Sequence, residues 1–275
     1  MKIYKFSNIL ALPFAALLLY FISFLLSDTH DLRASWAVIP LISLVLIYLF
    51  QPQIDYWWLN KRPVEIDENV LKLIAKTNEN YRTLSEEWKD EFHKRLLLYV
   101  NARSFSAKGM EKDSDVPYDI KFMIAQIPVF LTLKEKDFLL KGIDRIILYK
   151  HAFPSPRYRF LHTAETHNED GVVLFSLEHA EAAFFHPDQF YNVAWHAFAE
   201  SYMILRGVNY FPETDDLVWT RIEEISGLDK DKIIKTIGYE SFDPLVTVIT
   251  CFFCYRNRFQ ELWPEMYARL NAMFV

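Results

Sequence analysis

The sequence has few of the residues that build loop-rich or disulfide-stabilised proteins. Among its 275 residues there are only two cysteines and six glycines. A disulfide scaffold needs more cysteines, and a disordered chain is poorer in aromatic side chains. Aromatic residues make up 16% of this chain. The composition therefore favours packed helices and a membrane interface over a loop-rich or disordered protein.

Long basic runs are also missing. The formal net charge is −6, and no stretch of lysine and arginine is long enough to follow a phosphate backbone. Nucleic-acid-binding proteins carry a basic patch or stripe. We therefore expect no nucleic-acid partner. The expected partners are a membrane and a protein or peptide.

Both cysteines lie in one short segment, Cys251-Phe-Phe-Cys254. The spacing CxxC is typical of a redox pair or of half a zinc site. No second CxxC occurs, neither Pro nor Gly shapes the pair as a turn, and the flanking residues are apolar. Free cysteines are common in protein cores. We interpret the pair as buried and structural.

The N-terminal part of the chain predicts a membrane anchor. No charged residue occurs in the segment at about 6–26, which as a helix is long enough to cross a bilayer of about 30 Å. After a short polar turn, the segment at about 34–50 is apolar again. A signal peptide would have a shorter apolar region and a small-residue cleavage site. Residues 1–54 are therefore predicted to form a two-helix transmembrane hairpin.

The charges around this hairpin predict its orientation. Lysine and arginine flank its two outer ends, whereas the turn carries more acid than base: Lys2, Lys5, Lys61 and Arg62 against Asp28, Asp31 and a single Arg33. Positively charged flanks stay in the cytoplasm. We expect a multi-pass protein of the inner (cytoplasmic) membrane whose soluble domain faces the cytoplasm.

The rest of the chain predicts an α+β domain. Residues 55–83 read as a connector, and the domain extends over 84–275. Ser85 is followed by two glutamates, which is typical of a helix start. The Ile-rich segment 145–149 and the Gly-bounded segment 171–176 predict two strands. Few strands among many helices indicate a mostly helical domain with a small sheet.

Two further segments are assigned from composition. The apolar stretch 121–133 predicts a helix that bends near Pro128. Residues 155–171, which are mainly polar, are expected to connect the two strands.

A histidine and a glutamate four residues apart occur in the apolar stretch 191–200, "YNVAWHAFAE". In a helix, His196 and Glu200 lie on one face and can meet one ion. The stretch has the outline of the zinc-peptidase helix HExxH, in which two histidines bind zinc and the first glutamate is the general base. Here Ala197 replaces the base and Glu200 replaces the second histidine.

From about Leu84 to its end, the chain resembles the Mlc titration factor A family, the glucose-regulated zinc peptidases. The resemblance depends on "GVVLFSLEHA" followed by "FYNVAWHAFAE". Upstream, "LSEEW", "IPVFLTL" and "RIILYKHAF" support it, and downstream "YESFDPLVTVIT" resembles the family's Tyr-x-x-x-Asp-Pro-x-Glu segment. The family implies a zincin-like fold.

The resemblance also implies which site residues are kept. The first zinc histidine falls on His196 and the active-site tyrosine falls on Tyr239. The catalytic glutamate falls on Ala197, the second zinc histidine on Glu200 and the third ligand on Val246. Valine does not coordinate a metal, and no base remains for the proton transfer. We therefore expect no cofactor and a catalytically inactive protein that has a regulatory or protein-binding role.

Alternatives remain open from the sequence. A rebuilt zinc site would make the chain a metal-dependent peptidase, with His196, Glu200 and a borrowed donor as ligands: Glu223, Glu224, Glu240, Asp243, His162, His167, His179 or His186. We prefer to interpret these donors as solvated loop histidines and a charged helix face. For His196 and Glu200, the corresponding interpretation is a hydrogen-bonded, half-buried remnant of an ancestral site. A purely structural membrane protein is the third reading. A groove for a peptide strand at a sheet edge can outlast the chemistry.

Overall fold

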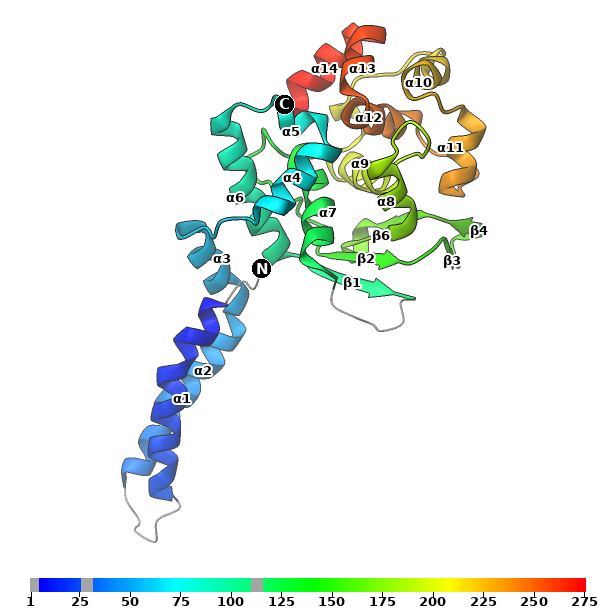
Figure 1. The fold of residues 1–275 in the computed structure, drawn as a ribbon. Helices are drawn as coiled ribbons and strands as arrows, with labels where there is room; N and C mark the ends of the chain where they lie inside the picture. Colours follow the sequence, from blue (N-terminus) through cyan, green and yellow to red (C-terminus); the bar gives the residue numbers. More distant parts are fainter. Residues whose placement is uncertain (1–4, 26–31, 110–115) are drawn as a thin grey trace. The chain divides into compact units, whose positions relative to one another are not determined.

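The computed structural model of the chain describes residues 5–25, 32–109 and 116–275 (Figure 1). It divides into two units, Met1–Glu65 and Ile66–Val275. The polar turn of the predicted hairpin lies largely outside the described residues.

The first unit contains α1 (Phe6–Leu25), the 3₁₀ helix η1 (Leu32–Ala37), α2 (Val38–Leu49) and α3 (Gln51–Lys61). Helices α1 and α2 pack side by side (Figure 1). At the start of α1, the Ser7 hydroxyl donates to the Asp55 carboxylate at 2.9 Å, and the Phe6 and Trp58 rings stack at 3.8 Å. These contacts join α1 to α3 within the unit.

One helix among the described residues is long and apolar enough by itself to cross a membrane, and it is α1. It matches the first predicted span. The second predicted span is formed by η1 and α2, and α2 has only 12 residues. Residues 35–49 pass the same test only together with α3, from which they are bent by 70°. The structure therefore shows one possible membrane-crossing helix and does not show the complete two-helix hairpin.

The second unit begins with α4 (Glu68–Thr77), α5 (Glu79–Thr83) and α6 (Glu86–Ala102). Asp67, Asn78 and Ser85 cap these three helices through their side chains. The segment read as a connector thus contains two helices whose Ile74, Asn80 and Tyr81 are buried. Those side chains belong to the core of the second unit.

A four-stranded sheet follows, in the order β1-β2-β6-β5. Strands β1 (Ser104–Lys108), β2 (Arg145–Tyr149) and β6 (Val172–Ser176) are parallel, and the edge strand β5 (Ala164–His167) is antiparallel to β6. Strands β3 (Phe153–Ser155) and β4 (Tyr158–His162) form a separate hairpin beside the sheet (Figure 1). The two predicted strands are confirmed as β2 and β6.

The segment 155–171 is not the simple connection that the sequence predicts. It holds the end of β3, all of β4 and β5, and the 3₁₀ helix η2 (Asn168–Asp170). Strand β1 was likewise not predicted, because its sequence "SFSAK" is short and mostly polar. The predicted helix at 121–133 is confirmed as α7 (Tyr118–Leu131), which contains Pro128.

Helices complete the second unit. They are α8 (Leu177–Phe185), α9 (Val193–Arg206), η3 (Val208–Tyr210), α10 (Val218–Ser226), α11 (Lys230–Ile237), α12 (Pro244–Cys254), α13 (Arg256–Leu262) and α14 (Pro264–Phe274). Helix α9 packs against β5, β6, α7 and α12. It therefore lies at the centre of the unit, and the CxxC pair is part of α12 next to it, with Cys251 fully buried. The α+β fold is confirmed.

Candidate functional site

Helix α9 carries the altered zinc-peptidase motif. The Asn192 side chain caps it by accepting the Trp195 N–H at 3.1 Å, and Gly207 ends it with a φ of 78°. Every residue from Val193 to Ala199 is buried. Because the helix is enclosed on most sides, its polar residues need partners from neighbouring elements.

His196 is fully buried and has only one polar contact. Its Nδ1 lies 2.8 Å from the Tyr191 hydroxyl, whereas its Nε2 has no hydrogen-bond partner among the described residues. The Phe242 ring meets the imidazole edge to face, with centroids 4.8 Å apart. Burial lowers the pKa of His196 to about 3, so the imidazole is neutral at physiological pH.

Glu200 lies one turn further along α9 and lines a cleft of about 530 Å³. Its carboxylate accepts a hydrogen bond from the Thr166 hydroxyl of β5 at 3.0 Å. Burial raises the pKa of Glu200, and the hydrogen bond from Thr166 opposes this shift in part. Tyr239, Asp243 and Val246 also line the cleft, but His196 does not. His196 and Glu200, which were predicted to meet at one ion, are thus separated: Glu200 forms part of the wall of the cleft, and His196 is buried behind it.

Tyr239 is held at the cleft by two contacts. Its hydroxyl donates to the Ala164 carbonyl at 2.6 Å, and its ring stacks on Tyr158 at 4.2 Å. Burial, and secondly the charge of Glu200, raise the pKa of this phenol far above its usual range. The Tyr239 hydroxyl is therefore protonated and fixed in position, and it already donates its hydrogen bond to the backbone of the protein.

Side chains of the protein itself form hydrogen bonds with the outer edge of β5. Ser176 N–H donates to the Thr163 carbonyl. In this antiparallel ladder the backbone carbonyls of Thr163 and Glu165 therefore point towards β6, whereas those of Ala164 and Thr166 point away from the sheet. The Ala164 carbonyl accepts from Tyr239, and the Thr166 carbonyl accepts from Arg157 Nη1 at 3.2 Å. A peptide that adds as a strand here must displace both side chains. At this edge of the sheet, a strand-binding groove is therefore closed by the chain itself.

His162 and His167, two of the possible borrowed donors, meet at Glu165. The Nε2 atoms of both histidines lie 2.9 Å from the Glu165 carboxylate, which also accepts from Ser155 at 3.2 Å. In β5, the side chain of Glu165 points to the opposite face from that of Thr166, the residue that contacts Glu200. These donors are consequently engaged with each other and do not join His196.

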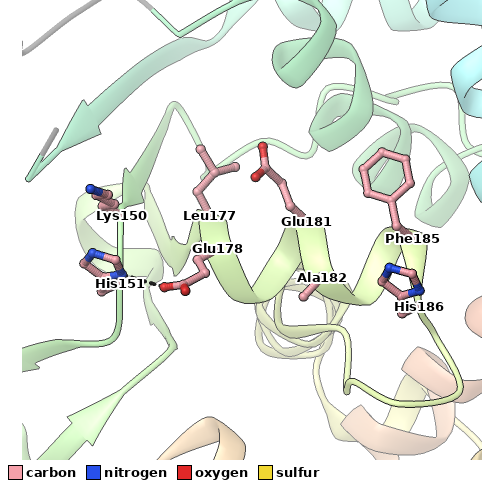
Figure 2. A pocket seen from close by; sticks show the side chains of 8 residues that line it. All are labelled: Lys150, His151, Leu177, Glu178, Glu181, Ala182, Phe185 and His186. Carbon is pink, nitrogen blue, oxygen red and sulfur yellow. Dashed lines mark hydrogen bonds and ion pairs between the residues drawn. The ribbon is translucent and has the colours of Figure 1, made fainter.

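Apart from Asp243, which lines the cleft, the remaining donors are also separate from the site. His179 Nδ1 lies 2.9 Å from the Ser176 hydroxyl. His186 lines a different hollow, of about 770 Å³, along α8 (Figure 2). In that hollow His151 contacts Glu178 at 2.5 Å, and Glu181 and Phe185 project from one side of the helix (Figure 2). Glu223, Glu224 and Glu240 are exposed, and Asp243 caps α12 by accepting the Leu245 N–H.

Some residues of the cleft were not anticipated from the sequence. Arg157 and Tyr158 line it, and Thr166 holds Glu200. All three come from the segment read as a polar connection. The alternation of Tyr158, Phe160 and His162 was the available signal, because it has the period of a strand.

A comparison with protein families identifies the family of the chain. The model of the glucose-regulated metallo-peptidase family M90 matches residues 55–275. The chain belongs to this family. No curated protein matched the chain in a direct search. The family match begins before Leu84 and includes α4 and α5, in agreement with their burial in the second unit.

The residues present do not fit the zinc site of a metallopeptidase. Such a site takes three protein ligands and keeps one position open for water. Of the three ligand positions that the resemblance implies, His196 offers one unpaired nitrogen, Glu200 is bonded to Thr166, and Val246 is a buried apolar side chain. Within the described part of the chain, no three His, Cys, Asp or Glu side chains form a group suited to a metal ion. Ala197, to which the resemblance assigns the position of the base, is also fully buried.

Proposed function

We propose that this metallopeptidase-family protein is a membrane-anchored, catalytically inactive member that acts as a regulatory, protein-binding module. The observation that carries the proposal is the aromatic and apolar setting of His196. Phe242 packs on the imidazole, and Val246, to which the resemblance assigns the third ligand, is a buried apolar side chain. Proton transfer by a general base contributes roughly 10²–10⁴-fold to such reactions, and position 197 has no group to provide it.

The membrane part of the proposal extends the finding of α1 to two crossings. The second crossing is the predicted span at about 34–50, and residues 35–49 support it in that they pass the test of length and composition together with α3. With the basic flanks inside, both ends and the second unit are in the cytoplasm. The protein is then a multi-pass protein of the inner membrane.

The second candidate is a metal-dependent peptidase with rebuilt ligands. The unpaired Nε2 of His196, one helical turn from Glu200, is the observation that favours it. It requires the Glu200 carboxylate to break its hydrogen bond with Thr166. It also requires a third metal ligand to move to the site from another part of the protein. It also needs a new base. For these reasons we prefer the inactive form.

Metal analysis of the purified full chain separates the two candidates. We expect less than stoichiometric zinc and no hydrolysis of unstructured peptide substrates. The control is His196→Ala, which removes the kept nitrogen. Stoichiometric zinc in the wild type that disappears in His196→Ala would overturn the inactive assignment and favour the rebuilt site.

Restoring the family residues provides a positive test of the scaffold. The triple variant Ala197→Glu, Glu200→His and Val246→Glu is expected to bind zinc and to gain thermal stability when zinc is added, because ligand binding to the folded state raises its stability. Its matched control adds His196→Ala and is expected to bind none. Failure of a folded triple variant to bind zinc would show that these positions do not correspond to the family's ligands.

A further inference from the structure

The β3–β4 hairpin exposes apolar and basic side chains together. Phe160 and Leu161 of β4 are 56% and 60% exposed, and Phe190 is 43% exposed. Arg159, next to Phe160 in β4, is also exposed, with its guanidinium 5.4 Å from the Phe160 ring. Single exposed apolar residues are normal on protein surfaces. Consecutive ones on a projecting hairpin are less common and need a reason.

A hollow joins Leu161 and Phe190 to α11. These two side chains line a hollow of about 740 Å³ together with Lys232 and Lys235. Both lysines are exposed. The acidic residue in the lining is Asp188, and Arg258 lies 3.8 Å from its carboxylate. Side chains alternate along β4, so Arg159 lies on the same face as Leu161, whereas Phe160 points to the other face. The surface formed by Arg159, Leu161, Phe190, Lys232 and Lys235, called here the hairpin patch, is therefore apolar with a basic border.

We infer that the hairpin patch binds the surface of an anionic lipid bilayer. Aromatic and leucine side chains insert at the boundary between headgroups and acyl chains, while arginine and lysine keep their charges at the headgroups. The inference relies on the anchor of the proposed function. Only residues 62–67 separate α3 from α4, so the tether between the anchor and the second unit is short.

Charge complementarity selects the lipid surface over other occupants. The patch presents three exposed cations, and each basic side chain near an anionic membrane strengthens binding about five-fold. The remaining contact is apolar and has no special shape, which suits a fluid surface. A second copy of the chain would bring the same positive charges against each other.

Site-specific fluorescence on the full chain tests the inference. The variant Leu161→Cys is labelled with an environment-sensitive dye and reconstituted into phosphatidylcholine vesicles with or without phosphatidylglycerol. The matched control is Leu217→Cys, at a residue of similar exposure (58%) that lies outside the hairpin patch. Burial raises the pKa of the native Cys251 thiol to about 12, and that of Cys254 well above its usual range, so both react slowly.

We expect nitroxide-bearing lipids to quench the dye at position 161 in anionic vesicles and to leave the dye at 217 unaffected. Lys232→Gln and Lys235→Gln should each reduce the ratio of docked to undocked domains about five-fold. Equal quenching at 161 and 217, or quenching that ignores lipid charge, would overturn the inference. A blue shift of the dye emission that depends on the protein-to-lipid ratio and occurs without quenching would also overturn the inference, because it indicates that a second copy of the chain covers the patch.

Loss of the anchor gives a different result from loss of the patch. A chain that alkaline extraction removes from the vesicles contradicts the membrane anchor, and the inference that depends on it. A retained chain whose dye at 161 remains in water contradicts the hairpin patch alone.

Discussion

His196 is a buried imidazole with an unpaired Nε2, and this makes the stability of the protein depend on pH. The pKa of His196 is lowered from 6.5 to about 3 by burial. The unfolded chain therefore binds a proton below pH 6.5 that the folded chain does not bind. The stability is fully present above pH 6.5 and is lost as the pH falls towards 3.

We expect this single group to reduce the free energy of unfolding by about 2 kcal/mol at pH 5 relative to pH 7. His196→Gln should remove that part of the pH dependence, as measured by urea unfolding of the full chain in detergent at a series of pH values. The matched control is His186→Gln, which removes an exposed histidine. An equal change in both variants would show that burial of His196 is not the cause.

At this scale the sequence predicts the placement of His196 and Glu200 on one helix but not their surroundings. The spacing of His196 and Glu200 predicts a common helix face, and both residues are indeed on α9. Phe242 packs on the imidazole of His196, and Thr166 donates to the carboxylate of Glu200. Both partners belong to segments that are distant from α9 in the sequence. Spacing within one helix contains no information about such contacts.

At the scale of elements, the short segment between α11 and α12 holds the hairpin in place. Gly238 ends α11 with a φ of +88° and precedes Tyr239. A Cβ at this position would lie 2.4 Å from the Leu161 carbonyl oxygen and 2.7 Å from the His162 Cα. The close approach lets the backbone of α11 meet β4 directly.

We predict that Gly238→Ala costs roughly 3 kcal/mol or more of stability, because backbone atoms must move to admit the methyl group. The matched control is Gly227→Ala, at a left-handed residue (φ +73°) with no atom within 4 Å of the added Cβ. It should cost only about 1–2 kcal/mol, from the backbone conformation alone. Equal losses in thermal or urea unfolding would contradict the proposed contact between α11 and β4.

The elements that the sequence predicts are those with strong local signals. Ser85 and its glutamates mark α6, and the β-branched segments mark β2 and β6. Strand β5 has the sequence "AETH". Its polar side chains are buried because they form hydrogen bonds with side chains of other segments: Thr166 with Glu200, and Glu165 with His162 and Ser155. Partners that come from other elements turn a polar segment into a buried strand, and no local pattern predicts that.

At the scale of the whole molecule, the number of membrane crossings decides where the second unit resides. With two crossings and basic flanks inside, a reporter fused after Val275 is expected to be in the cytoplasm. A fluorescent protein that folds only there should be active, and a phosphatase that needs the outside should not. Deleting residues 34–50 leaves one crossing and is expected to exchange the two results. If the deletion leaves the reporter on the same side, those residues do not cross the membrane.

The side chains of Arg157 and Tyr239 on the outer carbonyls of β5 have a consequence for the protein's neighbours. A bare strand edge is a template on which other chains add and aggregate. An active peptidase can use such an edge for its substrate, whereas an inactive one that keeps it open only attracts unwanted chains. The two donors make β5 a poor template. If the protein is the inactive, membrane-anchored member proposed above, they allow it to remain unaggregated at a strand edge that has no cleavage reaction to release what binds there.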